Sequence, residues 1–184
     1  MRQQAKQPSQ GLIQQWQYLA VPALMVPRKV SELSNADLID YVIGRYHTAL
    51  RSLFPKLIPA ARTVERLHSD HPDCPHGLAN VLKVLSDELS DHFDKEQDEL
   101  FPSMLHSPQH NLRFPIDRRR AEHEDFADQL DTLARLTNNY VAPDHTGSDW
   151  RMLYDTCRRL DNDLRLHIHF EEDVLFPRFE MAAQ

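Results

Sequence analysis

Two short segments of this sequence carry the same pair of polar residues at the same spacing. They are HFDKEQDELFP (92–102) and HIHFEEDVLFP (167–177). In each segment a histidine is followed by a glutamate four residues later and by Phe-Pro nine residues later. Residues at i and i+4 share one face of an α-helix, so each His/Glu pair can grip one metal ion or bridge two. This repeat, 75 residues apart, predicts the same metal-binding helix twice.

Two further histidines fit the same repeat. His47 and His123 lie 76 residues apart, each in the helix that precedes one of the His/Glu pairs. We therefore expect two helical hairpins of similar design, and the predicted metal ligands are His47, His92, Glu96, His123, His167 and Glu171. Four imidazoles and two carboxylates suit a pair of first-row transition metals, with each glutamate bridging both ions.

The elements that must position these residues are expected to be four long helices. Glycine is scarce, with 4 in the chain, and long segments show apolar residues at alternating steps of three and four. The expected helices cover 36–68, 78–105, 116–139 and 150–179, the first with an N-cap at Ser34 or Asn35 and a kink at Pro55 and Pro59. Three short loops between them predict an all-α, antiparallel, up-down-up-down four-helix bundle over 34–184. Residues 1–33 are expected to form an N-terminal extension.

The six predicted ligands stand on the apolar seams of these helices, where leucine would otherwise lie. An ionised glutamate in an apolar core costs several kcal/mol unless it is paired, hydrogen-bonded or bound to metal. In an antiparallel bundle all six also fall near one end, within about 10–18 Å of it. A structural bundle without metal is the alternative, and it predicts that replacing His92 or Glu96 with alanine would be neutral or stabilising.

Composition excludes several classes of function. The net charge is −7 and no sustained basic stripe is present, which argues against a nucleic-acid partner. No apolar run approaches the roughly 20 residues of a membrane span. The two cysteines, Cys74 and Cys157, form no CxxC pair, so we expect no disulfide framework and a cytoplasmic location. A monomer and a homodimer are both compatible with the sequence.

Five segments together resemble the hemerythrin-like four-helix bundles, and among these the repair-of-iron-centres (RIC) proteins. They are DLIDYVIGRYH, LFPKLIPAARTVERLH, ELSDHFDKEQDELFP, AEHEDFADQLDTLARLTNNY and HIHFEEDVLFPR. The six ligands that the resemblance implies are the six residues named above. Oxygen-carrying hemerythrins resemble the chain less, because they have a second ligand histidine one turn from the position of His123, where this chain has Arg119 and Ala127. Many RIC proteins also carry an N-terminal domain with adjacent cysteines, whereas residues 1–33 contain no cysteine.

The resemblance implies a non-haem di-iron protein, with manganese or zinc less favoured than two irons. It further implies repair of iron–sulfur centres under nitrosative or oxidative stress, with iron passed to an apo iron–sulfur acceptor protein. The alternatives are an NO- or O₂-binding sensor, and an enzyme that reduces NO or activates O₂ or peroxide.

Four other residues are candidates for supporting roles. Glu88, Glu99 and Glu122 are candidates for contacting the ligands from outside or for lining a path to them. His68 lies on the seam of the first helix, but 21 residues of helix place it about 30 Å from His47, so it needs a different role.

Overall fold

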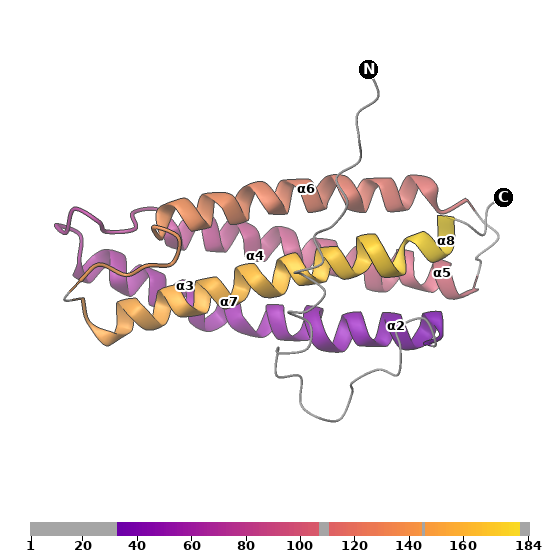
Figure 1. Ribbon diagram of the computed structural model, residues 1–184, viewed down its shortest axis with the longest axis horizontal. Coiled ribbons are helices and arrows are strands. Elements are labelled where there is room, and N and C mark those ends of the chain that lie inside the picture. The colour runs from indigo at the N-terminus through magenta and orange to yellow at the C-terminus, as the bar shows by residue number, and fades with distance from the viewer. Residues whose placement is uncertain (1–32, 107–110, 145, 181–184) are drawn as a thin grey trace, which may run out of the picture. The chain divides into compact units, whose positions relative to one another are not determined.

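Four helical columns run side by side along the long axis of the computed structural model (Figure 1). The structure describes residues 33–106, 111–144 and 146–180. Column A consists of α2 (Asn35–Val42), the π-helix η2 (Ile43–His47) and α3 (Thr48–Leu67). Column B consists of α4 (Leu78–Lys95), the π-helix η3 (Glu96–Leu100) and α5 (Phe101–His106). Column C is α6 (Arg113–Leu136), and column D consists of α7 (Ser148–Phe170), the π-helix η4 (Glu171–Leu175) and α8 (Pro177–Glu180).

The columns form the predicted bundle. Column A packs against B and D, and column C packs against the same two, so each column has two neighbours. Successive columns are joined by short connections and run in opposite directions (Figure 1). The described residues contain no strand. The all-α, up-down-up-down architecture predicted from the sequence is confirmed, whereas the predicted N-terminal extension lies outside the described residues apart from Leu33.

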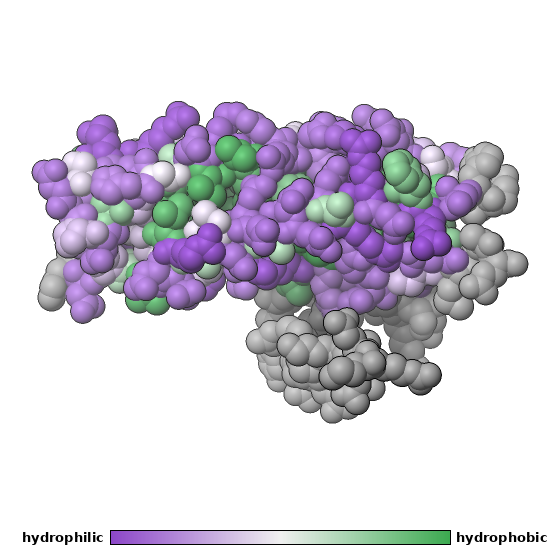
Figure 2. Space-filling view, turned by 90° about the horizontal axis from the view of Figure 1, so that it is seen from above, coloured by the Kyte–Doolittle hydropathy of each residue, from purple (hydrophilic) through white to green (hydrophobic). Residues whose placement is uncertain are grey.

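The core is built from the apolar seams. On α4 and α7 the seams are fully buried over Leu78, Leu82, Leu85 and Leu89, and over Leu153, Cys157, Leu160 and Leu164. Burying each of these leucine side chains contributes about 1.5–3 kcal/mol relative to leaving it exposed. Charged and polar side chains cover most of the face seen in Figure 2, with hydrophobic ones in small groups. None of the described helices has both the length and the apolar character needed to cross a lipid bilayer.

The first column begins with the expected cap and continues through two prolines. Ser34 caps α2 through a capping box with Asp37, whose backbone N–H donates to the Ser34 hydroxyl at 3.1 Å. α3 continues through Pro55 and Pro59, where the sequence predicts a kink in the helix. The two prolines lie on the exposed face, four residues apart. On the opposite face the apolar seam stays packed in the core, and this packing keeps the helix whole despite the missing backbone donors.

Candidate metal centre

The six residues predicted as ligands meet in the interior of the bundle, and every column contributes at least one. His47 comes from η2, His123 comes from α6, and columns B and D each supply one His/Glu pair. All are buried, with at most 3% of any residue exposed: His47, His92, Glu96, His123, His167 and Glu171. The residues that the repeat singled out thus form one cluster in the structure.

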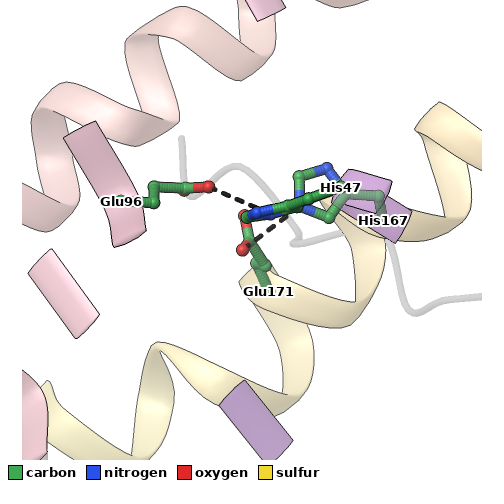
Figure 3. A group of neighbouring side chains, drawn as sticks. All are labelled: His47, Glu96, His167 and Glu171. Carbon is green, nitrogen blue, oxygen red and sulfur yellow. Dashed lines mark hydrogen bonds and ion pairs between the residues drawn. The ribbon is translucent and has the colours of Figure 1, made fainter. Parts of the chain in front are cut away.

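The cluster divides into two groups of possible ligands that share both glutamates. The first group is His47, Glu96, His167 and Glu171, drawn in Figure 3. The second is His92, Glu96, His123 and Glu171. Within each group, one ligand atom from every residue lies within 4.8 Å of the others. This spacing is compatible with one cation in each group.

The Glu96 carboxylate reaches toward one histidine of each group. Its Oε2 lies 3.3 Å from Nε2 of His47, and its Oε1 lies 3.2 Å from Nε2 of His92. The two oxygens of one carboxylate therefore serve two different groups. This is the arrangement expected of a bridging ligand.

The Glu171 carboxylate repeats this arrangement from the opposite column. Its Oε1 lies 3.2 Å from Nε2 of His167, and its Oε2 lies 3.2 Å from Nε2 of His123. In the first group, Nε2 of His47 and Nε2 of His167 also face each other at 3.2 Å (Figure 3). One of these nitrogens can donate a hydrogen bond to the other, or both can bind the same cation.

Unsatisfied polar atoms test whether these residues fit a metal. Although close to imidazole nitrogens, neither oxygen of Glu96 or Glu171 has a hydrogen-bond partner among the described residues. The same holds for Nε2 of His92 and of His123. Leaving so many buried polar atoms unpaired in one place is costly. Nitrogen and oxygen donors that point at common centres are the ligands borderline cations prefer, so the donor set fits metal ions.

The charge state of the glutamates suits the same role. Burial alone would raise the pKa of Glu96, but His92 and His47 outweigh it and hold the pKa well below its ordinary value. At Glu171, burial and the charge on Glu96 oppose ionisation, yet the imidazoles of His167 and His123 still lower the pKa. Both side chains are therefore carboxylates at neutral pH, the form that binds a cation.

Three π-helical turns lie at the centre, and none of them was predicted. His47 ends η2, while Glu96 and Glu171 begin η3 and η4. The backbone N–H of Phe101 donates to the carbonyl of Glu96, and that of Phe176 donates to Glu171 at 2.8 Å, both five residues back. A π-turn contains one more residue than an α-turn, so it shifts every later side chain around the helix. Such single turns are frequent at functional sites.

Aromatic rings line two of the imidazoles. The ring of His47 stacks on Phe93, with centroids 4.0 Å apart, and on Phe101 at 5.9 Å. The ring of His123 is parallel to Phe176 at 6.0 Å. The phenylalanine of each Phe-Pro repeat thus packs beside one histidine of its own hairpin.

Two of the four histidines are held from outside by carboxylates. Nδ1 of His92 lies 2.7 Å from Oε2 of Glu122, and Nδ1 of His123 lies 2.8 Å from Oε1 of Glu172. Arg119 in turn donates to Glu122 at 2.9 Å. Glu122 was among the residues proposed for such a role, but Glu172 was missed. Its signal was its position directly after Glu171, where an acid can reach the neighbouring column.

The other candidates for supporting roles lie elsewhere. Glu99 is exposed, because the π-turn η3 turns Leu100 inward in its place. Glu88 does not contact a ligand, and its carboxylate accepts a hydrogen bond from Gln129. Glu88 and Glu122 both line an acidic cavity of about 460 Å³ between α4 and α6. The ring of His68 packs on Trp150, 4.7 Å between centroids, at the start of α7.

Comparison with known proteins supports a metal-binding role for the cluster. Residues 38–182 match the family described as "Hemerythrin HHE cation binding domain". The chain is 42% identical over 147 residues to a protein of Pectobacterium atrosepticum named iron-sulfur cluster repair protein YtfE. It is 39% identical over 142 residues to the protein of the same name in Yersinia pseudotuberculosis.

These alignments cover most of the chain but less of its relatives. They span 80% and 77% of the chain, and 66% and 64% of the two relatives, respectively. The chain therefore corresponds to slightly less than two thirds of each relative's length. The match over residues 38–182 contains all six clustered residues and confirms the resemblance drawn from the sequence. This chain belongs to the hemerythrin HHE cation binding domain family.

Proposed function

We propose that this chain is a non-haem di-iron protein that supplies iron for the repair of iron–sulfur centres under nitrosative or oxidative stress. The main support is the buried cluster, in which two groups of ligands share Glu96 and Glu171. The names of the relatives, iron-sulfur cluster repair proteins, support the repair role. In this proposal the iron is cargo as well as a bound ion, and an apo iron–sulfur protein receives it.

Each residue of the cluster has a distinct part in holding iron. His47 and His167 would bind one ion, His92 and His123 would bind the other, and the two glutamates would bridge them. All six donors are imidazole or carboxylate groups, without a thiolate. Reduction of iron to the ferrous state weakens its attraction to carboxylates, and this gives the cargo a means of release. Iron is favoured over manganese or zinc by the family resemblance.

The acidic cavity beside Glu122 gives a cation an approach to this centre. Its lining includes Glu88, Asp91, Asp125 and Asp128 as well as Glu122, whose carboxylate contacts His92. A hollow lined by charges of one sign concentrates ions of the opposite sign. We infer that ferrous iron reaches the group of His92 and His123 from this side of the bundle.

The proposal is tested by metal content and by iron transfer. Protein purified without oxygen is expected to contain two irons per chain, one for each group of ligands. A Glu96→Ala/Glu171→Ala double variant is expected to contain none. The loaded protein, mixed with an apo-ferredoxin, sulfide and a reductant, is expected to restore the ferredoxin's cluster while losing its own iron. A protein that neither contains metal nor takes it up from ferrous iron would rule the proposal out.

A second candidate function uses the same centre to bind a diatomic ligand. Each group offers one ligand atom from each of four residues, fewer than the six that iron commonly takes, and this leaves room for NO or O₂. Incubation with NO and a reductant separates the possibilities. Donation to an acceptor depletes the iron, NO reduction turns over at constant iron content, and a sensor binds NO reversibly without either change.

The proposal also covers the cellular location and the oligomeric state of the protein. Cys74 and Cys157 are both free and buried, which suits a reducing compartment, and we propose a cytoplasmic location. Whether the protein is a monomer or a homodimer stays a prediction, to be measured by light scattering of the purified chain.

A further inference from the structure

The two groups of ligands differ in what holds their histidines from outside. In the group containing His92 and His123, each imidazole has its Nδ1 within 2.8 Å of a carboxylate oxygen. In the group containing His47 and His167, both Nδ1 atoms are buried and have no hydrogen-bond partner among the described residues. Among the described residues, both histidines of one group have a carboxylate acceptor and neither histidine of the other group does.

The two carboxylates are themselves fixed. Arg119 donates to Glu122 at 2.9 Å, and Arg120 donates through Nε to Glu172 at 2.7 Å. Arg120 also bonds Glu180, which does not reach the imidazole. His92 and His123 therefore each begin a chain of hydrogen bonds that runs from the imidazole to a carboxylate and on to a guanidinium. Such chains hold the ring in place and keep the proton on Nδ1, so Nε2 is left free to face the ion.

The internal repeat shows where the other group lacks these acceptors. Glu172 directly follows Glu171, and the matching position after Glu96 is Gln97, 75 residues earlier. The amide of Gln97 donates to the carbonyl of Phe93 at 3.1 Å, on its own helix. In the repeat, Gln97 corresponds to Glu172, the carboxylate that contacts His123. Its amide is neutral and bonded to its own helix, so His47 has no matching carboxylate there.

His167 also lacks a carboxylate at the position that corresponds to Glu122 in the repeat. Glu122 directly precedes His123, and the matching residue before His47 is Tyr46, 76 positions earlier. The Tyr46 ring lies beside His167, 5.5 Å between centroids, where a carboxylate would be required. The two groups therefore differ because the repeats differ at two positions, Glu172 against Gln97 and Glu122 against Tyr46.

We propose that the two metal ions are held with unequal affinity, the tighter one by His92 and His123 and the weaker one by His47 and His167. A carboxylate on the outer nitrogen orients a metal-bound histidine and makes it a stronger donor, and loss of such a partner costs about 10- to 100-fold in metal affinity. This rests on the proposed function, because it requires two bound ions. It identifies the ion at His47 and His167 as the one available for donation while the other stays bound.

Equilibrium binding of ferrous iron to the whole chain tests this assignment. Equilibrium is preferable to release rates, because the acidic cavity adjoins His92 and rates would also depend on the path. The protein is dialysed without oxygen against buffers of fixed free ferrous iron, and iron per chain is measured. Two steps separated by at least about 10-fold in free iron are expected.

Ligand variants identify which step belongs to which group. His47→Ala is expected to keep the tight step and lose the weak one, and His123→Ala is expected to keep only a weak step. Far-UV circular dichroism checks that each variant folds. Two steps of equal affinity, or loss of the tight step in His47→Ala, would overturn the assignment. Failure of the wild-type chain to bind iron at any concentration would instead overturn the proposed function.

Variants of the outer carboxylates test the cause without touching a ligand. Glu172→Ala and Glu122→Ala are each expected to weaken the tight step about 10- to 100-fold, and Glu172→Gln, which retains a carbonyl acceptor, is expected to weaken it less. Glu180→Ala is the matched control, because it removes a carboxylate from Arg120 without removing an imidazole partner. Gln97→Glu is expected to tighten the weak step. An unchanged tight step in both alanine variants would refute the role of these carboxylates.

Discussion

Glu96 and Glu171 lie at the centre of the bundle, and each places one carboxylate oxygen 3.2–3.3 Å from a histidine of each group. They come from columns B and D, which lie diagonally opposite each other in the bundle. Their side chains meet in the core. Because each carboxylate serves both groups, the two metal positions are expected to depend on the same pair of residues, while each histidine serves one position only.

This sharing predicts different losses for glutamate and histidine variants. Glu96→Gln is expected to lower occupancy at both positions, whereas His167→Ala is expected to leave one ion per chain, because it belongs to one group only. The measurement is metal per chain after dialysis against limiting ferrous iron. Glu99→Gln is the control, since Glu99 is exposed in the same π-turn and should leave both ions in place. Full occupancy of one position in Glu96→Gln would show that the carboxylate does not bridge.

Metal removal is expected to destabilise the fold. An ion that binds only the folded chain adds about 2.7 kcal/mol at 100 times its dissociation constant. For a chain of this size, that corresponds to a rise in Tm of about 5–10 °C. Thermal melts with and without a chelator measure it by circular dichroism. The Glu96→Ala/Glu171→Ala variant should show no effect of the chelator, and an equal effect there would point to a second metal site.

The metal-free protein is expected to lose stability as pH rises above neutrality. Burial opposes a charge on His92, but Glu96 and Glu122 outweigh it and raise the pKa to about 9 from 6.5. A raised folded-state pKa stabilises the protein below the unfolded pKa, and this contribution is lost as pH rises through the folded value. The free energy of unfolding should therefore fall between pH 6.5 and about 9.

Urea denaturation of chelator-treated protein at several pH values measures this fall. His92→Gln is the matched variant, and its stability should decline less over the same range. Metal binding must displace the proton from His92, so the apparent affinity for ferrous iron is expected to rise with pH over this interval. A metal-free stability that does not change between these pH values would contradict the assignment of a protonated His92.

The π-turn η3 predicts that Leu100, and not its neighbour Glu99, contributes to the stability of the core. Leu100 is 4% exposed whereas Glu99 is exposed. A continuous α-helix would place both residues, at i+3 and i+4 from Glu96, near the same face, whereas the π-turn brings Leu100 alone into the core. Leu100→Ala is expected to lower the free energy of unfolding by about 2–5 kcal/mol. Glu99→Ala is expected to change it by less than about 0.5 kcal/mol. Urea denaturation of both variants compares them, and a loss in Glu99→Ala as large as that in Leu100→Ala would contradict the π-turn.

Much of the fold could be predicted from the sequence because helical periodicity is a local property. The seams of α4 and α7 repeat at steps of three and four, and their leucines are buried as that spacing requires. α3 runs through Pro55 and Pro59 because proline weakens a helix only locally, whereas the packing of Phe54, Leu57 and Ala61 in the core sustains it. A local rule is unreliable where neighbouring columns supply the stabilising contacts.

The sequence by itself determined the four columns, the identity of the six clustered residues and the family. These follow from residue type and spacing along single helices. Only the tertiary structure decided the three π-turns, since α- and π-turns differ by one backbone hydrogen bond and packing selects between them. It alone also decided that Glu122 and Glu172 reach His92 and His123, while His47 and His167 have no such partner in the part of the chain that the structure describes. This depends on how far one column is rotated and shifted against the next.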